Sequence, residues 1–202
     1  MSVEQCSALR YDCDSLDRRP SLPTSALIDC GSLSQLTVRR LDAHVMIIRS
    51  LTKEEVEVEP FQVWNAFVDL LSTENYGDLS SEQRPAHLVF WYESEVQNGG
   101  HFQYFENRGA EHLAATVEAL GSVGATCQQE LLREAGELWL SLTRSRVQTT
   151  EEFCDTALED EFEAFDSRFH DCSPSVQECL EAHLERYQAF FVSVTCTRHL
   201  HR

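Results

Sequence analysis

Two cysteines and a histidine toward the C-terminal end are of residue types that bind transition metals. Cys179 and His183 are four residues apart on one face of a predicted helix, and Cys172 precedes them. Zinc sites usually draw paired ligands at short spacing from two places in a chain, and no such pairs occur here. The same helix face is apolar and includes Leu184. A histidine packed in the core is the favoured interpretation, and a metal-dependent enzyme built on these three residues is the alternative.

Signatures of other catalytic sites are absent from the sequence. No Glu-x-x-His pairs suggest a di-iron centre. The run Gly121-Ser122-Val123-Gly124 lacks the Lys-Ser/Thr pair that completes a phosphate-binding loop, and nothing resembles a nucleophile elbow. The sequence therefore predicts a protein that is not an enzyme and that has no cofactor and no bound metal.

Carboxylates dominate residues 151–185, which hold twelve acidic residues and one basic residue, Arg168. A predicted helix over 151–169 carries a row of acids spaced by three or four residues, with Asp160 beside it: Glu152, Asp155, Glu159, Glu163 and Asp166. Its predicted buried face comprises Cys154, Leu158, Phe162, Phe165 and Phe169. A predicted helix over 174–194 carries a second row, Glu178, Glu181 and Glu185, opposite Val176, Leu180, Leu184, Tyr187 and Phe191. These nine acidic residues are called the acidic stripe.

The acidic stripe destabilises its helices through repulsion between like charges, and a surface that only keeps the protein in solution does not require this. Like charges three or four residues apart on a helix destabilise it by roughly 0.2 to 0.5 kcal/mol per pair, and a solubilising face normally mixes both signs. If residues 151–185 were all helical they would extend about 52 Å, which gives one carboxylate per roughly 4 Å. One DNA strand carries a phosphate per about 3.4 Å. The stripe therefore indicates a recognition surface, with plain solubility as the alternative.

The net charge of the whole chain also indicates a surface that recognises basic partners. Its 202 residues include 34 acidic and 16 basic side chains, for a net charge of −18. Residues 1–45 hold six of the acids and five of the bases, which leaves 28 acids and 11 bases in residues 46–202. A negative field of this size repels nucleic acid and anionic membranes and attracts basic proteins. Direct binding of nucleic acid or of a membrane is therefore the least expected function.

The sequence also predicts the cellular compartment in which the protein is found. No run approaches the roughly 20 apolar residues of a membrane span. The opening residues, Met-Ser-Val-Glu-Gln-Cys, lack the basic and apolar regions of a secretory signal, so a cytoplasmic protein is expected. The eight cysteines include no Cys-x-x-Cys pair, and in that compartment they are expected to be reduced thiols.

Asn98-Gly99-Gly100 joins two segments that both have helical periodicity. Glycine and asparagine favour the left-handed conformation that ends a helix, so Asn98-Gly99 predicts a C-terminal cap. A short second helix should follow over 101–107. Gln103 and Asn107 are four residues apart on one face of it. We favour a structural role, in which this stretch sets the angle between two packed helices, over a binding site at these two residues.

The same stretch resembles the DNA-mimic protein (DMP) family. The resemblance covers roughly residues 60–195, and it is carried by Glu93, Asn98, Gly99, Gly100, Gln103, Tyr104, Phe105 and Asn107, and by the later run Ala119-Leu120-Gly121-Ser122-Val123-Gly124-Ala125. Where that family often has an aromatic residue after the second glycine, this chain has His101. The resemblance implies an all-helical, acidic protein, a homodimer, that occupies the DNA-binding surface of a regulator.

The elements that must position these residues are helices joined by short links. Helices are predicted at 61–72, 81–97, 101–107, 110–121, 127–142, 151–169 and 174–194. Thr149 with Glu152, and Ser173 before Pro174, predict the starts of the last two. No strand is predicted, since the best run, 56–58, is too short and too acidic. The fold class is all-α, a compact multi-helix bundle over 46–202.

Residues 1–45 are rich in serine and lack periodicity, so a largely disordered extension of low order is expected there, with a possible helix over 36–51. One hypothesis is that translation begins at Met46, which the intact mass of the natural protein tests.

We therefore predict an acidic, cytoplasmic DNA mimic that binds a transcription regulator or another basic DNA-binding protein through the acidic stripe. The alternative function, which also depends on attraction between an acidic surface and a basic protein, is an immunity-type inhibitor of a basic toxin such as a nuclease.

Overall fold

The computed structural model describes residues 46–141, 149 and 161–196, all within the compact unit Asp42–Arg202. The predicted extension over 1–45 and its boundary lie outside these residues, and so does the predicted capping box of Thr149 and Glu152, because Glu152 is not described. Four residues of the acidic stripe also lie outside: Glu152, Asp155, Glu159 and Asp160.

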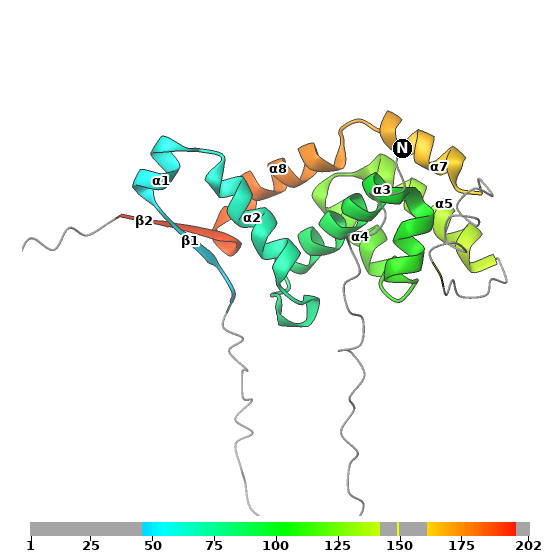
Figure 1. The fold of residues 1–202 in the computed structure, drawn as a ribbon, viewed down its shortest axis with the longest axis horizontal. Coiled ribbons are helices and arrows are strands. Elements are labelled where there is room, and N and C mark those ends of the chain that lie inside the picture. Colours follow the sequence, from blue (N-terminus) through cyan, green and yellow to red (C-terminus); the bar gives the residue numbers. More distant parts are fainter. Residues whose placement is uncertain (1–45, 142–148, 150–160, 197–202) are drawn as a thin grey trace, which may run out of the picture. The chain divides into compact units, whose positions relative to one another are not determined.

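The all-α class is confirmed, and the described helices pack around one central helix, α3 (Arg84–Arg108). Figure 1 shows α3 in contact with the helices on either side of it in the sequence and with the two last helices. The elements other than α3 are α1 (Lys53–Val58), α2 (Gln62–Thr73), α4 (Leu113–Val123), α5 (Thr126–Ser141), α7 (Glu163–Asp171), α8 (Val176–Tyr187), the short 3-10 turns Tyr76–Asp78 and Gln188–Phe190, and two strands, β1 (Arg49–Thr52) and β2 (Val192–Thr195).

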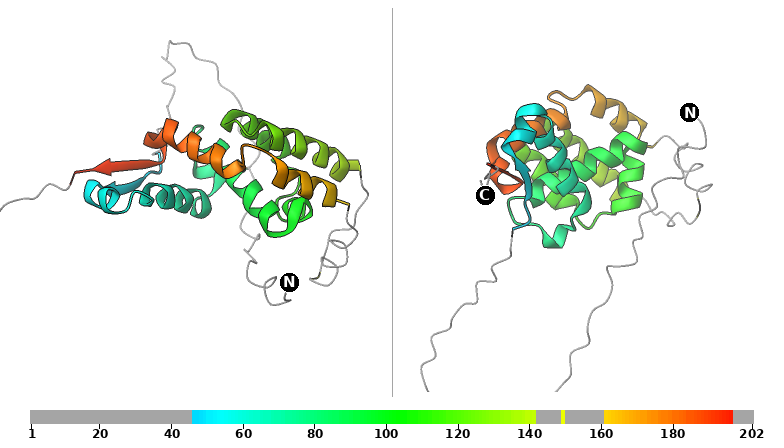
Figure 2. Two further views of the ribbon diagram at one scale, coloured as in Figure 1. Left: turned by 90° about the horizontal axis from the view of Figure 1, so that it is seen from above. Right: turned by 60° about the vertical axis from the view of Figure 1, so that its left-hand side comes forward.

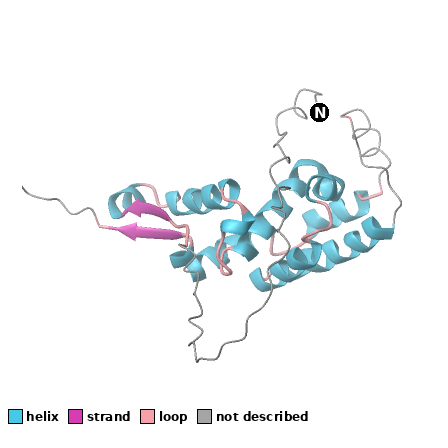
Figure 3. Ribbon diagram, turned by 90° about the horizontal axis from the view of Figure 1, so that it is seen from below, coloured by secondary structure: helices cyan, strands magenta, loops and turns pink. Residues whose placement is uncertain are grey.

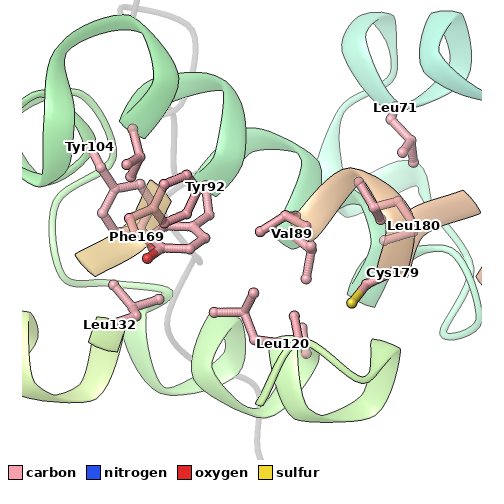
Figure 4. Packing of buried hydrophobic residues seen from close by; sticks show 14 of the residues in the cluster. Leu71, Val89, Tyr92, Tyr104, Leu120, Leu132, Phe169, Cys179 and Leu180 are labelled. Atoms are coloured by element: carbon pink, nitrogen blue, oxygen red, sulfur yellow. The ribbon is translucent and has the colours of Figure 1, made fainter. Parts of the chain in front are cut away.

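The core is formed where α3 meets its neighbours. Tyr92 is fully buried, and its ring packs edge-on against Tyr104 at 5.1 Å and against Phe169 of α7 at 5.7 Å between ring centroids. Figure 4 shows these three rings together, with Val89 of α3 lying toward Leu120 of α4. Aromatic pairs in this edge-to-face geometry add about 0.5 to 1.5 kcal/mol beyond the area they bury. The residues that give α3 its apolar periodicity therefore also hold α7 in place.

The two strands overturn the prediction that the chain has none. β1 and β2 pair in parallel, with Arg49 opposite Val192 and Thr52 opposite Thr195 (Figures 1 and 3). The helix predicted over 36–51 is wrong at residues 46–51, and the helix predicted to reach residue 194 ends at Tyr187. Each strand has only four residues, so neither shows a periodicity of its own. Their pairing depends on contacts between opposite ends of the domain, which local pattern does not reveal.

Gln83, just before α3, holds both ends of this domain. Its side chain is fully buried, and its Nε2 donates to the carbonyl oxygens of Ile47 at 2.6 Å and of Phe190 at 2.7 Å. Its Oε1 accepts a hydrogen bond from the backbone N–H of Ser80 at 3.0 Å. Buried polar groups need such partners, because an unpaired one costs about 1–3 kcal/mol. Gln83 thus fixes the segments that lead into β1 and β2 against the start of α3.

The start of α8 differs by two residues from the prediction. Ser175, not Ser173, is the N-cap, and it forms a capping box with Glu178, whose carboxylate accepts from the Ser175 backbone N–H at 2.8 Å. Pro174 precedes this N-cap and so lies outside the helix, and the peptide bond between Ser173 and Pro174 is cis. These hydrogen bonds from the Ser175 backbone and hydroxyl lower the pKa of Glu178.

The prediction of eight reduced cysteines is wrong for two of them. Cys127 at the start of α5 and Cys172 after α7 form a disulfide, with their Cα atoms 5.7 Å apart. The two are 45 residues apart in the sequence, and only the packing of α7 on α5 brings them within bonding distance. In the described part of the chain, Cys179 is a buried free thiol and Cys196 an exposed one.

The break in α3 occurs at the predicted place but in a different conformation. Residues Arg84–Arg108 form two helical halves, and Gly99 and Gly100 between them leave the helical region and kink α3. The residue with positive φ is Gly100 (φ 74°, ψ −175°), not Asn98 or Gly99 as a left-handed cap would require. This backbone region is essentially restricted to glycine. The kink sets the angle between the two halves of α3.

Candidate functional site

The described part of the acidic stripe lies on α7 and α8, which follow one another along one side of the domain (Figures 1 and 2). Glu163, Glu181 and Glu185 are exposed, while the predicted buried face of α8 is buried at Val176, Leu180 and Leu184. Tyr187 is an exception at 38% exposed. Among the described residues, no lysine or arginine forms an ion pair with any of these three carboxylates. They remain available to a cationic partner.

Asp166 does not belong with these exposed acids. Its Oδ1 accepts hydrogen bonds from the backbone N–H of His101 at 2.8 Å and from the Nδ1 of His101 at 2.6 Å, and its side chain is 32% exposed. The helical spacing that put Asp166 in the stripe was right, but spacing does not show what lies opposite. His101, in the first turn of the second half of α3, provides both hydrogen-bond donors to this carboxylate. Asp166 therefore has a structural role.

The Asp166 contact continues into the core. The Nε2 of His101 lies 2.9 Å from the hydroxyl of Tyr92, and both side chains are fully buried. With Nδ1–H donated to Asp166, the Nε2 of a neutral His101 accepts from the tyrosine hydroxyl. A Tyr-His-Asp row can move protons in an enzyme, but no substrate reaches two fully buried side chains. The row is an internal hydrogen-bond network that joins α3 to α7.

The motif around Asn98-Gly99-Gly100 has a structural centre that the sequence analysis missed, Glu95. This carboxylate is 7% exposed and accepts hydrogen bonds from Gln103 Nε2 at 3.0 Å, Asn107 Nδ2 at 2.7 Å and Arg108 Nε at 3.1 Å. Arg108 also lies over the ring of Trp91 at 3.9 Å. The amides of Gln103 and Asn107 thus bind one carboxylate across the kink, which favours a structural role for these two residues. Local spacing gives no signal for this cluster, because residues eight apart on an unbroken helix lie about 12 Å apart along its axis and here the kink intervenes.

Other residues of the motif pack in the core. Tyr104 and Phe105 are buried, the Tyr104 hydroxyl lies 3.4 Å from the Thr116 hydroxyl oxygen, and Phe105 stacks on Trp139 of α5 at 5.0 Å. Burial raises the pKa of Tyr104. Glu93 is half-buried and Asn98 is exposed, and neither lies in this core.

Glu93 and Asn98 line a groove between α2, α3 and α8. Its volume is about 420 Å³, and its lining residues are Trp64, Phe90, Glu93, Ser94, Gln97, Asn98, Gln177 and Leu180. Burial raises the pKa of Glu93 to about 6, although a hydrogen bond from the backbone of Gln177 opposes the shift. In the described residues no ion pair involves this carboxylate. The fold thus keeps a half-buried acid without a compensating cation.

We expect Glu93→Gln to stabilise the protein at neutral pH. Because the folded-state pKa is raised from 4.5 to about 6, the folded protein holds this proton more tightly. The unfolding free energy should therefore fall as pH rises from about 4.5 to 6 and then level off. Glu93→Gln removes this loss, so its advantage should grow over that window to about 1–2 kcal/mol above pH 6. Urea denaturation at pH 4.5, 5.5 and 7.5 measures it, and an advantage that does not change with pH would contradict the assignment.

The residues of the metal alternative do not form a ligand set in this structure. Cys172 is bonded to Cys127, which removes it as a thiolate. His183 is half-buried, with its ring 4.8 Å from Tyr187 and 5.9 Å from Phe191, and burial lowers its pKa. Within the described ranges no group of three or more His, Cys, Asp or Glu side chains is placed to hold a metal ion. Among the helices that the structure describes, none is both long and apolar enough to cross a bilayer.

Comparison with protein families finds one family model that covers most of the helices described above. A family model described as "DMP19-like protein" matches residues 77–189. The matched range includes α3 with its kink, the Glu95 cluster, the Glu93 groove except Trp64, and all nine residues of the acidic stripe. Comparison with curated proteins and with solved structures gives no match.

Proposed function

The chain belongs to the DMP19-like protein family, and from this we propose that it is a DNA mimic that occupies the DNA-binding surface of a transcription regulator or another basic DNA-binding protein. It would act by binding, in the cytoplasm and as a homodimer, with no catalytic step. The family membership supports the class of function, and the exposed acids of this chain support the choice of surface.

The observation that carries the proposal is the row of unpaired carboxylates on α7 and α8. Glu163, Glu181 and Glu185 are exposed, and no cation of the described residues forms an ion pair with them. The nearest basic side chain in sequence to the first row, Arg168, is paired with Glu134 of α5 at 2.7 Å instead. Charges left uncompensated in this way attract a basic surface and speed its association, in a manner that salt weakens.

The proposed contact surface differs in part from the sequence-based one. Glu163, Glu181 and Glu185 form its described portion, with Glu178 beside them at the helix start. Glu152, Asp155, Glu159 and Asp160 remain proposed contacts on the basis of sequence spacing alone. Asp166 is left out, because its carboxylate is held by His101.

The test begins with affinity capture from native cytosol at low salt, followed by elution with duplex DNA. A basic DNA-binding protein released by DNA is the expected partner, because the two ligands would compete for one surface. If capture instead returns one small basic toxin that neither duplex DNA nor salt elutes, the proposed regulator is wrong and the chain is an immunity-type inhibitor.

Reversing the charge of Glu163, Glu181 and Glu185 to lysine should then weaken binding of that partner at least about tenfold, since like charges would face each other across the interface. Titration of the purified partner measures the change. The matched control is Glu118, Glu130 and Glu137 to lysine, three exposed acids of α4 and α5 with the same change in net charge. Equal losses in the two variants would show that net charge, not this surface, governs binding.

A further inference from the structure

The groove at Glu93 has a chemical character that the acidic stripe does not share. Its aromatic lining comes from Trp64 of α2 and Phe90 of α3, both half-buried, and the carboxylate of Glu93 lies among the lining residues. Cations bind favourably against the faces of tryptophan and phenylalanine, and more strongly where water is partly excluded. An acid beside two aromatic rings is therefore a combination suited to a positively charged group.

The polar part of the lining consists of Ser94, Gln97, Asn98 and Gln177, whose side chains can accept as well as donate hydrogen bonds. The amide nitrogen of Gln177 donates to Glu181 at 2.8 Å, which leaves its carbonyl oxygen free to accept. A guanidinium group has five N–H donors in one plane, stacks on aromatic rings and is weakly hydrated, whereas an ammonium group is a compact and strongly hydrated charge. The groove therefore fits arginine better than lysine.

The groove also adjoins the acidic stripe. The hydrogen bond from Gln177 to Glu181 links a lining residue directly to one of the three exposed acids. A basic protein seated on α8 would hold its side chains within reach of this groove. The stripe and the groove differ in kind: the stripe offers exposed charge, and the groove combines the half-buried Glu93 with two aromatic side chains.

We propose that the groove lined by Glu93, Trp64 and Phe90 binds the guanidinium group of an arginine side chain supplied by a protein partner. The inference rests on the proposed function in assuming a basic partner, but the affinity of the groove for arginine is a property of this chain alone. Glu93 pairs with the guanidinium, the two rings stack against it, and side-chain oxygens of the polar lining accept hydrogen bonds from its remaining N–H groups. The groove selects one arginine, while the acidic stripe provides the long-range attraction.

The experiment is a titration of the purified full chain with N-acetyl-arginine amide, followed by NMR of the Trp64 indole N–H. N-acetyl-citrulline amide, which has the same shape and no charge, is the matched control ligand, and N-acetyl-lysine amide is the third probe. We expect saturable binding of the arginine probe, with citrulline at least tenfold weaker and lysine weaker by several fold. Equal binding of arginine and citrulline, or tighter binding of lysine, would overturn the guanidinium assignment.

Two variants locate the site. Glu93→Gln should weaken binding of the arginine probe at least tenfold, and because it is expected to stabilise the fold, lost binding does not report unfolding. Glu118→Gln removes the same charge from an exposed position of α4 and should leave binding unchanged. Equal losses in the two variants would mean that the net field attracts the probe, and the groove would then not be its site.

The two proposals fail separately. If the arginine probe does not bind but a DNA-displaceable partner still depends on Glu163, Glu181 and Glu185, the groove is excluded and the mimic stands. If the arginine probe binds as expected and capture returns no partner that DNA displaces, the groove stands and the mimic is excluded.

Discussion

Glu95→Ala is expected to lower the unfolding free energy by about 3 kcal/mol or more, because it removes the acceptor of three hydrogen bonds, each worth about 1.5–3 kcal/mol when one partner is charged. Gln103, Asn107 and Arg108 all donate to this one carboxylate, which is 7% exposed. For a folded unit of this size, such a loss lowers the melting temperature by roughly 6–12 °C. Urea denaturation followed by circular dichroism measures it, with an unchanged slope showing that the unfolded state is not altered.

The control for Glu95 is an acid with the same kind of partner in a different environment. Glu134 pairs with Arg168 at 2.7 Å, but both side chains are about half exposed. Glu134→Ala should change the midpoint far less, since exposed ion pairs contribute little to stability. Comparable losses at Glu95 and Glu134 would contradict the view that the buried cluster holds the two halves of α3 together.

Gly100→Ala is the second large effect, with an expected loss of about 3 kcal/mol from two sources. An alanine at φ 74° and ψ −175° is strained by about 1–3 kcal/mol. In addition, the new Cβ would clash with Oδ2 of Asp166. Asp166 must then move away from His101, which leaves a fully buried histidine short of a partner, at a further cost of about 1–3 kcal/mol. Thermal unfolding measures the sum.

Gly109→Ala separates the two sources. Gly109 has nearly the same backbone conformation (φ 61°, ψ −163°), but a Cβ built there meets no atom within 4 Å. It should show the conformational strain alone, and so a clearly smaller loss than Gly100→Ala. If the two losses are equal, the contact between Gly100 and Asp166 contributes nothing, and the His101 network does not depend on a glycine at this position.

Most helices were predicted from the sequence because each needs only its own residues to be recognised. α2, α4 and α5 have apolar positions at helical spacing and short connections, and their observed bounds differ from the predicted ones by at most three residues. The strands were missed for the opposite reason. β1 and β2 have four residues each, and Arg49 pairs with Val192, which lies near the other end of the domain sequence.

The candidate site divides in the same way. Glu163, Glu181 and Glu185 were predicted to be exposed because the apolar residues of their helices define the opposite face, and the structure places all three at the surface. Asp166 has the same spacing and a different role, since His101 lies against it. Glu95 and the aromatic lining of the groove were not identified at all, because each depends on residues from separate turns or separate helices.

The sequence by itself determined the all-α class, the excess of negative charge, the break in α3 and the family, since each is a property of composition or of neighbours along the chain. Only the tertiary structure decided which acids are free and which are held. It paired Cys127 with Cys172, placed Asp166 on His101 and gathered three donors around Glu95. It also placed Glu93 in the groove that Trp64 lines, with no ion pair to that carboxylate among the described residues. The physical reason is that a carboxylate's role is set by the groups within a few ångströms of it, and in a folded chain most of those groups are distant in sequence.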